Sequence, residues 1–198
     1  MSSETRELIL ASHNAGKLRE FQAVLGKRWI LRPQSDFFIG DVDETGATFV
    51  ENALLKARHA SQQGGLAALA DDSGLVVPAL GGDPGLRSAR YSGEGDAGNN
   101  RLLLDNMAHL EGRDREAFFI AVLVLLRHPD DPTPIIAEGR WQGRIAHAPR
   151  GEQGFGYDPL FVPVGYDRHS AELAAEEKNR VSHRALAIQH LLDQLTTA

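Results

Sequence analysis

The chain has 198 residues and contains no cysteine. The absence of cysteine excludes disulfides, thiolate zinc sites and cysteine nucleophiles, and it is consistent with the cytoplasmic location that we expect. The N-terminal stretch, residues 1–7, is polar and too acidic for a signal or transit peptide. The longest apolar run, residues 117–126, is too short to span a bilayer as a helix. We therefore expect no membrane partner.

Net positive charge is also lacking, because acidic residues outnumber basic ones and the formal net charge at pH 7 is −6. A broad basic face for duplex nucleic acid is not expected, and we expect no nucleic-acid partner. Any anion site must then be local, built from a few cations, backbone amides and a metal ion. Lysine is the rarer cation, with four lysines against 17 arginines, so lysine is expected where a compact ammonium is needed. The lysines are Lys17, Lys27, Lys56 and Lys178.

The sequence signatures of several enzyme classes are absent. No H-E-x-x-H motif occurs among the eight histidines. No G-x-S-x-G elbow is present, and no G-x-G-x-x-G motif follows the first predicted strand. The Walker A spacing G-x-x-x-x-G-K-[ST] is missing as well. These absences argue against a zincin, an α/β-hydrolase, a dinucleotide-binding protein and a P-loop protein.

Strand-like and helix-like segments alternate along the chain, which predicts an α/β fold in a single domain over residues 1–198. The apolar segment 117–126 predicts a central strand buried on both faces. Thr48 and Glu51 predict a capping box, and Gly64-Gly65 predicts the end of the same helix. The other predicted strands cover 7–12, 29–31, 66–70 with a continuation at 75–77, 135–141 and 160–162; the predicted helices cover 17–25, 48–63, 99–107, 170–177 and 182–195.

A loop of small residues follows the first predicted strand and precedes the first predicted helix. Backbone N–H groups at a helix N-terminus point toward a ligand, and the helix dipole favours an anion there. Lys17 adds a point charge, and Ser12 and Asn14 add hydrogen-bonding groups. We therefore predict a phosphate-binding loop, made of Ser12, His13, Asn14, Ala15, Gly16 and Lys17.

Two adjacent acids, Asp71 and Asp72, follow a predicted buried strand and precede Ser73-Gly74. Neighbouring carboxylates at a strand end repel each other unless a cation lies nearby, and in extended backbone they point to opposite sides. Glu44 lies in a polar loop before the helix at 48–63. One carboxylate from each place can hold a Mg²⁺ ion whose other ligands are water and phosphate oxygens. The alternative is that these acids are turn and capping residues.

The loop at 154–159 combines two aromatic residues with glycine and an acid, in the order Phe155, Gly156, Tyr157 and Asp158. An aromatic ring in a loop can stack on a nucleobase. Asp158 can accept a hydrogen bond from the edge of a base. The alternative interpretation is a hairpin turn whose aromatic rings lie in the core.

The last predicted helix begins with cations. Ser182 is placed as an N-cap, yet His183 and Arg184 fill the first turn and Lys178 precedes it. Each cation there opposes the helix dipole, at a cost of about 0.3–1 kcal/mol at exposed sites. Cations kept at a helix N-terminus despite this cost indicate a functional role, here the binding of a ligand with carbonyl or phosphate oxygens. The alternative is that all three side chains are solvated and the cost is small.

Taken together, these segments resemble the inosine triphosphate pyrophosphatase family, and within it the bacterial dITP/XTP pyrophosphatases. They follow the family's order and span nearly the whole chain, and their joint spacing is highly specific. One position departs from the family, which usually has glycine where this chain has His13. The matching segments are residues 12–17 with Glu20 beyond, 44–46, 49–57, 70–75, 81–93, 154–159 and 182–184.

The resemblance implies an elongated two-lobed α/β fold, with a long twisted mixed β-sheet flanked by helices and a central substrate cleft. It also implies a homodimer that hydrolyses ITP, dITP and XTP to the monophosphate and pyrophosphate, with Mg²⁺ as cofactor. The biological role would be the cleansing of the nucleotide pool. Two alternatives on a similar scaffold are a nucleotide sensor without catalysis and a pyrophosphatase for modified pyrimidine or methylated nucleotides.

The resemblance further implies roles for the residues singled out above. Asp72 would hold Mg²⁺ together with Glu44 and would also activate the attacking water. Donors beside the base suit the 6-oxo group of a deaminated purine and reject the 6-amino group of adenine. Ser73 would contact the substrate beside Asp72. The triphosphate would be bound by the loop Ser12, His13, Asn14, Ala15, Gly16 and Lys17 with Lys56; the base pocket would be formed by Phe155, Gly156, Tyr157 and Asp158 and closed by Lys178, His183 and Arg184.

Overall fold

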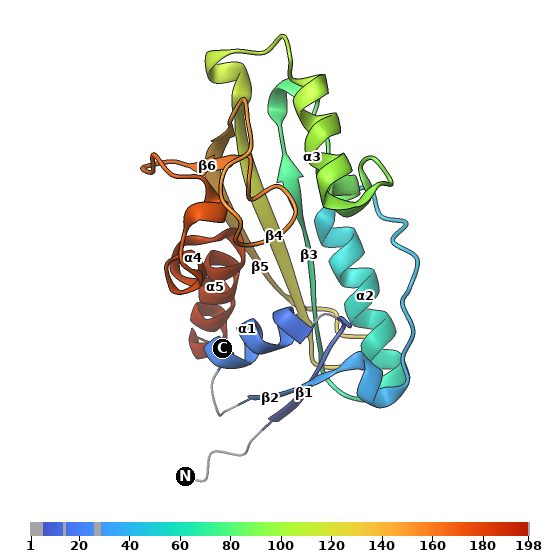
Figure 1. The fold of residues 1–198 in the computed structure, drawn as a ribbon. Helices are drawn as coiled ribbons and strands as arrows, with labels where there is room; N and C mark the ends of the chain where they lie inside the picture. Colours follow the sequence, from blue (N-terminus) through green and yellow to red (C-terminus); the bar gives the residue numbers. More distant parts are fainter. Residues whose placement is uncertain (1–5, 14, 26–28, 198) are drawn as a thin grey trace. The chain divides into compact units, whose positions relative to one another are not determined.

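The computed structural model describes residues 6–13, 15–25 and 29–197, and these residues form a mixed sheet with helices beside it. Within them six strands lie in the order β2-β1-β3-β4-β5-β6 (Figure 1). Strand β1 is parallel to β2 and β3, whereas β6 is antiparallel to β5. The α/β prediction and the mixed sheet are therefore confirmed. The strands are β1 (Arg6–Leu10), β2 (Trp29–Pro33), β3 (Ala68–Val76), β4 (Glu116–Leu126), β5 (Ile135–Ile145) and β6 (Phe161–Pro163).

The helices follow the predicted order along the chain. They are α1 (Ala15–Leu25), α2 (Phe49–Gly64), α3 (Gly95–Asn106), α4 (Ala175–Val181) and α5 (His183–Thr197). Among the residues covered by the structure, no helix is both long enough and apolar enough to cross a membrane. The chain divides into two compact units. The first contains Met1–Asp72, Ala121–Gly139 and Ala187–Ala198, and the second contains Ser73–Ile120 and Arg140–Leu186.

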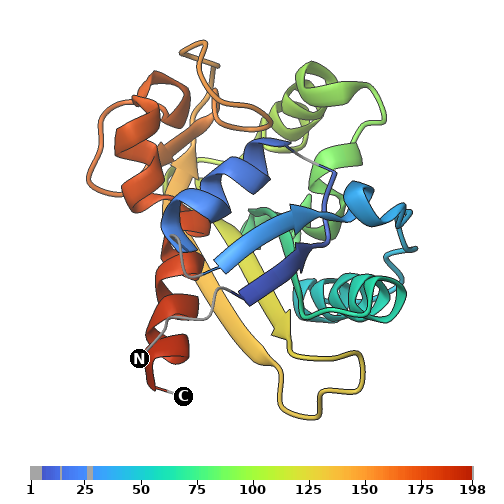
Figure 2. The ribbon, with the colours of Figure 1, turned by 90° about the horizontal axis from the view of Figure 1, so that it is seen from below.

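The core of the first unit lies between its strands and two helices. Leu8 and Leu10 of β1 pack in one cluster with Phe21 of α1 and Leu191 of α5. Ile9 points to the opposite face, because side chains alternate along a strand. Helix α2 lies on that face (Figures 1 and 2), and a Cβ added at Gly64 would come within 2.1 Å of Cδ1 of Ile9. Glycine at this position therefore allows α2 to approach β1 closely.

Helix α2 has the ends that the sequence predicts. Thr48 is the N-cap, and its Oγ1 accepts a hydrogen bond from the backbone N–H of Glu51. The Glu51 carboxylate reaches back to the N–H of Ala47, at 2.9 Å, one residue further than in a standard capping box. Gly65 ends the helix in the left-handed region, with φ of 66°.

The second unit has its own core, which includes Leu75, Leu103, Trp141 and Phe161. Arg115 is 4% exposed and lies beside this core. Its guanidinium donates to the carbonyl oxygens of Met107, Leu110, Ile145 and Ala146, at 2.8–3.2 Å. These bonds tie the start of β4 to the end of β5 and to the chain that follows α3.

Two details of the predicted secondary structure are wrong. Residues 170–177 do not form one helix: a single turn at Ser170–Glu172 is separated from α4 by extended backbone at Leu173 and Ala174. That break lets Leu173, which is 1% exposed, reach the core of the second unit. In addition, β3 runs without interruption through Asp71 and Asp72, so these acids lie inside a strand and not at its end.

Asp131 organises the turn between β4 and β5. It is 1% exposed and accepts hydrogen bonds from the backbone N–H groups of Arg127 and Thr133, both at 3.0 Å. Its carboxylate also pairs with the Arg127 guanidinium at 2.7 Å, and this hydrogen bond holds the pKa of Asp131 well below its usual range. A carboxyl group with a depressed pKa stabilises the fold above its unfolded-state pKa and loses that contribution as the pH falls.

We expect Asp131→Ala to lower the free energy of unfolding at pH 7 by about 1–3 kcal/mol, because two backbone N–H groups lose their acceptor. Urea denaturation followed by circular dichroism measures this value. Asp130→Ala is the matched control, since the neighbouring Asp130 is exposed. Equal stabilities of the two variants would show that the turn does not depend on these hydrogen bonds.

Candidate functional site

In the first unit, Lys56 brings two carboxylates together. Its Nζ lies 3.0 Å from Oε1 of Glu44 and 2.8 Å from Oδ1 of Asp72. The three side chains are mostly buried, with 17%, 25% and 12% of their surface exposed for Lys56, Glu44 and Asp72. Lys56 comes from α2, Asp72 from β3 and Glu44 from the extended segment before α2. Lys56 therefore reaches inward from α2.

Asp71 points to the other side of β3 and pairs with a second lysine. Nζ of Lys17 lies 2.7 Å from Oδ1 of Asp71, whose side chain is 1% exposed. Lys17 lies in the first turn of α1, a helix without an acidic residue in that turn. The opposite orientation of Asp71 and Asp72 follows from the alternation of side chains along a strand. Each of the two adjacent acids thus has its own lysine.

Burial and the neighbouring charges shift the pKa values of the Lys56–Asp72 pair. Burial raises the pKa of Asp72, the Lys56 ammonium opposes this, and Glu44 and Asp71 add to the increase. Burial lowers the pKa of Lys56, but the carboxylates around it, Asp72 above all, outweigh burial and raise it. A carboxylate whose pKa is raised in this way is a better proton acceptor near neutral pH than an ordinary aspartate.

Glu44 and Asp72 fit the ligand requirements of Mg²⁺. Both approach within 3.0 Å of one cationic atom, Nζ of Lys56, which shows that they can converge on a single cation. No cluster of three or more His, Cys, Asp or Glu side chains suited to a metal ion occurs in the described part of the chain. Mg²⁺ is commonly bound by one or two carboxylates, with water and substrate phosphates completing its shell. A pair of hard oxygen ligands matches that pattern and lacks the nitrogen and sulfur ligands of a structural zinc site.

The predicted phosphate-binding loop lies between β1 and α1, as expected. Ser12 follows β1 and is half-buried, whereas His13 is exposed, with its Nε2 3.3 Å from Oδ1 of Asp41. Asn14 lies outside the described residues. Ala15, Gly16 and Lys17 form the start of α1, so the helix begins within the predicted loop. In the second unit, Ser73 continues β3 directly after Asp72 and is half-buried.

In the second unit, the loop at 154–159 separates its two aromatic rings. Phe155 is 61% exposed, whereas Tyr157 is 3% exposed and its hydroxyl donates to the carbonyl oxygen of Ser88 at 2.9 Å. Burial also raises the pKa of Tyr157. Tyr157 therefore lies in the core, as the alternative interpretation predicts, whereas the ring of Phe155 is available for stacking.

Two cations lie over the exposed ring of Phe155. Nζ of Lys178 is 5.3 Å and Cζ of Arg184 is 5.9 Å from the ring centroid. Both distances are within the range of cation–π attraction. A planar ring with hydrogen-bond donors beside it can hold a flat heterocycle that carries carbonyl oxygens.

Asp158 holds this arrangement together. It is 3% exposed, and its Oδ2 accepts hydrogen bonds from the backbone N–H of Phe155, at 2.9 Å, and from Nζ of Lys178. Oδ1 accepts from the Ser170 hydroxyl at 2.8 Å. Both carboxylate oxygens are therefore used within the protein, and Asp158 orients Lys178 and the loop.

The basic residues at the start of α5 are buried. His183 is 8% exposed and Arg184 is 7% exposed. The His183 ring stacks on Phe119, with centroids 4.9 Å apart, and Ser182 accepts a hydrogen bond from the N–H of Ala185 as an N-cap. The Lys178 side chain is 18% exposed. The alternative that all three cations are solvated is therefore wrong.

Sequence reasoning did not single out Ser170, Asp96 or Asn100 as parts of this site. Ser170 lies 12 residues from its partner Asp158. Asp96 and Asn100 contact Gly156 from 60 and 56 residues away. These polar residues have no distinctive spacing, so no signal in the sequence alone identifies them.

Three comparisons show what the chain is similar to. The profile of the Ham1 family matches residues 8–194. A dITP/XTP pyrophosphatase from Pseudomonas aeruginosa is 56% identical over 190 residues, which is 96% of each chain, and one from Pseudomonas syringae pv. tomato is 55% identical over the same share. A solved structure of a HAM1 protein from Coxiella burnetii has a TM-score of 0.93 at 46% identity, covering 98% of this chain and 100% of that one.

Proposed function

The chain belongs to the Ham1 family, and we propose that it hydrolyses the deaminated purine nucleoside triphosphates dITP, ITP and XTP to the monophosphate and pyrophosphate. The observation that carries the proposal is the match of 55–56% identity over 96% of each chain with relatives named dITP/XTP pyrophosphatase. Two groups of side chains support it. Those around Lys56 and Asp72 in the first unit suit the triphosphate of such a substrate, and those around Phe155 in the second unit suit its base. The chain acts as one pyrophosphatase domain that cleanses the nucleotide pool.

The first unit supplies groups suited to the triphosphate. Lys17 and Lys56 offer ammonium groups, and the start of α1 offers backbone N–H groups. Ser12, His13 and Asn14 contribute the preceding loop. Ser73, the first residue of the second unit, follows Asp72 directly along β3. Glu44 and Asp72 would hold Mg²⁺, which when bound neutralises phosphate charge and polarises the phosphoryl oxygens.

We propose that Asp72 is the base of the reaction, which its raised pKa supports. Asp72 accepts a proton from water as the water oxygen forms a bond to the α-phosphorus. The bond between the α-phosphorus and the bridging oxygen to the β-phosphate breaks, and pyrophosphate leaves with that oxygen. Negative charge spreads over the phosphoryl oxygens, where Lys17 and Lys56 stabilise it.

The second unit supplies groups suited to the base. Phe155 offers an exposed ring for stacking, and Gly156, Tyr157 and Asp158 form the loop that carries it. Lys178, His183 and Arg184 offer hydrogen-bond donors, which match the 6-oxo group of hypoxanthine and xanthine. Adenine presents a donor at that position and would leave these donors without acceptors.

Product analysis tests the proposal. We expect dITP and XTP to give the monophosphate and pyrophosphate in equal amounts with Mg²⁺, and no turnover after chelation by EDTA. In water labelled with ¹⁸O, the label is expected in the monophosphate, because attack occurs at the α-phosphorus. ³¹P NMR and mass spectrometry of the products measure both.

Each alternative predicts a different outcome of the same assay. Orthophosphate as the only phosphate product, or label in pyrophosphate, would contradict the proposed reaction. Tight binding of ITP without turnover would indicate a nucleotide sensor. Turnover confined to modified pyrimidine or methylated triphosphates would indicate a pyrophosphatase specific for those nucleotides. A homodimer, which the family resemblance implies, and a cytoplasmic location, with which the absence of cysteine is consistent, are further proposals.

A further inference from the structure

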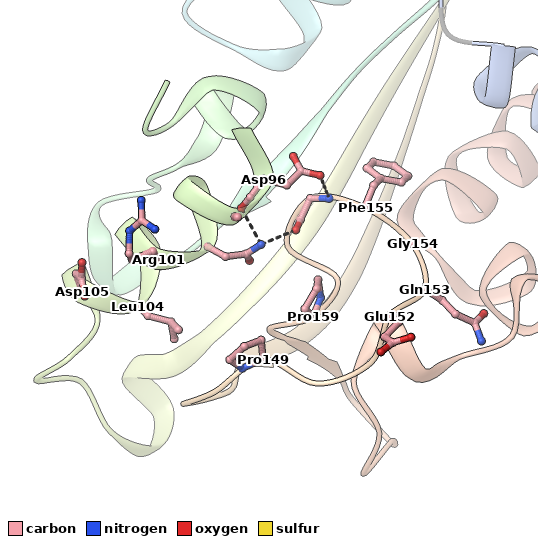
Figure 3. A pocket seen from close by; sticks show the side chains of 13 residues that line it. Asp96, Arg101, Leu104, Asp105, Pro149, Glu152, Gln153, Gly154, Phe155 and Pro159 are labelled. Carbon is pink, nitrogen blue, oxygen red and sulfur yellow. Dashed lines mark hydrogen bonds between the residues drawn. The ribbon is translucent and has the colours of Figure 1, made fainter. Parts of the chain in front are cut away.

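Both peptide groups of Gly156 are held by one helix of the second unit. The Gly156 N–H donates to Oδ2 of Asp96 at 2.7 Å. The Gly156 carbonyl accepts from Nδ2 of Asn100 at 2.8 Å. Asp96 lies in the first turn of α3, and Asn100 lies one turn later on the same face. Figure 3 shows Asp96 facing the loop that carries Phe155.

Gly156 is a position where the loop needs such support. Its φ is 60°, in the left-handed region that glycine adopts readily. It lies between the exposed ring of Phe155 and the buried ring of Tyr157. The next residues are anchored elsewhere, Tyr157 at Ser88 and Asp158 at Lys178 and Ser170. Phe155 is held through its own N–H by Asp158 on one side, and the Gly156 peptide groups set the backbone on the other, so both restraints fix where the Phe155 ring points.

Packing gives this side of the loop little support. A cavity of about 550 Å³ lies between α3 and the loop (Figure 3), and its lining includes Leu104, Pro149, Phe155 and Pro159. A cavity offers few atoms for dispersion contacts. On this side, the backbone of the loop is therefore held by the hydrogen bonds from Gly156 to Asp96 and Asn100 and not by side-chain packing.

The amide orientation that lets Asn100 bind the Gly156 carbonyl has an energetic cost. Its Nδ2 donates to the carbonyl oxygens of Asp96, at 2.9 Å, and Gly156. Its buried Oδ1 has no hydrogen-bond donor among the described residues. A buried acceptor without a donor is unfavourable, and residues that accept such a cost are often functional.

We propose that Asp96 and Asn100 are positioning residues for base recognition, which fix the Gly156 peptide groups and so present Phe155 to the purine. This inference rests on the proposed function. Neither residue touches the substrate; both act through the loop. Their loss should weaken the recognition of the base while leaving the groups suited to the triphosphate unchanged.

We expect Asp96→Ala and Asn100→Ala to raise KM for dITP about tenfold, the effect of losing one hydrogen bond, with kcat changed less than about twofold. Inhibition by inorganic tripolyphosphate, which has no base, should be unchanged. Asp96→Asn keeps an oxygen acceptor and should restore most of the affinity. Asp105→Ala is the matched control, because Asp105 is an exposed acid of the same helix that lines the same cavity.

The outcomes separate this inference from the proposed function. Normal turnover by the wild type together with unchanged KM in both alanine variants overturns the inference alone. Parallel losses in kcat and in tripolyphosphate inhibition also overturn it, because they indicate a general structural role. A wild-type enzyme that does not hydrolyse dITP overturns both. If an alanine variant fails to fold, Asn100→Asp, which keeps the size of the side chain and removes the donor, decides by the same KM criterion.

Discussion

Replacing Asp72 by asparagine is expected to lower kcat for dITP by about 10²–10⁴-fold, the contribution typical of a general base. The amide has nearly the same shape as the carboxylate but cannot accept a proton from water. Asp72 is also the residue whose pKa burial raises and whose oxygen lies 2.8 Å from Nζ of Lys56. The variant thus loses the proton acceptor and a negative charge beside the proposed metal.

Binding and stability measurements make this result interpretable. Calorimetric titration with dITP is expected to show that the Asp72→Asn variant still binds nucleotide, because the base-binding groups are unchanged. Asp43→Asn is the matched control, since Asp43 is an exposed acid in the same loop as Glu44. Circular dichroism checks that the variant is folded. Turnover at the wild-type rate would remove Asp72 from the mechanism.

The second large effect is expected in the discrimination between 6-oxo and 6-amino purines. A site built to donate hydrogen bonds to a carbonyl oxygen rejects an analogue that cannot accept them by about 10⁴-fold. We expect kcat/KM for dITP to exceed that for dATP by about this factor. Lys178→Met is expected to lower kcat/KM for dITP about 10- to 100-fold, the value of a hydrogen bond to a charged group, and to leave that for dATP nearly unchanged.

Lys178 is suited to this test because its surroundings are well defined. Its ammonium lies 5.3 Å from the Phe155 ring centroid and pairs with the buried Asp158. Arg180→Met is the matched control, because Arg180 is an exposed cation of the same helix. Equal losses of kcat/KM for dITP and dATP would mean that Lys178 stabilises the fold but does not recognise the base. Steady-state kinetics with pyrophosphate detection measures both substrates.

The sequence predicted those parts of the site that depend on local rules. The alternation of side chains along a strand predicted that Asp71 and Asp72 face opposite sides, and they pair with different lysines. The helix that begins after Thr48 was predicted from its capping residues, which act within a few residues of each other.

Local rules failed where a distant contact decided the backbone. The pattern at 170–177 favours one helix, but Leu173 fills the core of the second unit only if the chain extends there. Strand β3 continues through two acids and a glycine, although the local pattern predicts that the strand ends there. The burial of His183 and Arg184 also depends on distant residues, among them Phe119, on which His183 stacks.

The α/β class, the order of the helices and strands, the family and the residue types available for catalysis can all be predicted from the sequence. Periodicity, capping and the joint spacing of short motifs along the chain are enough to predict these features. Three features become known only in the folded protein: Lys56 joins Glu44 to Asp72, Phe155 is exposed while Tyr157 is buried, and α3 holds Gly156. They depend on contacts between residues of different elements, and the geometry of such contacts is set by packing and not by spacing in the sequence.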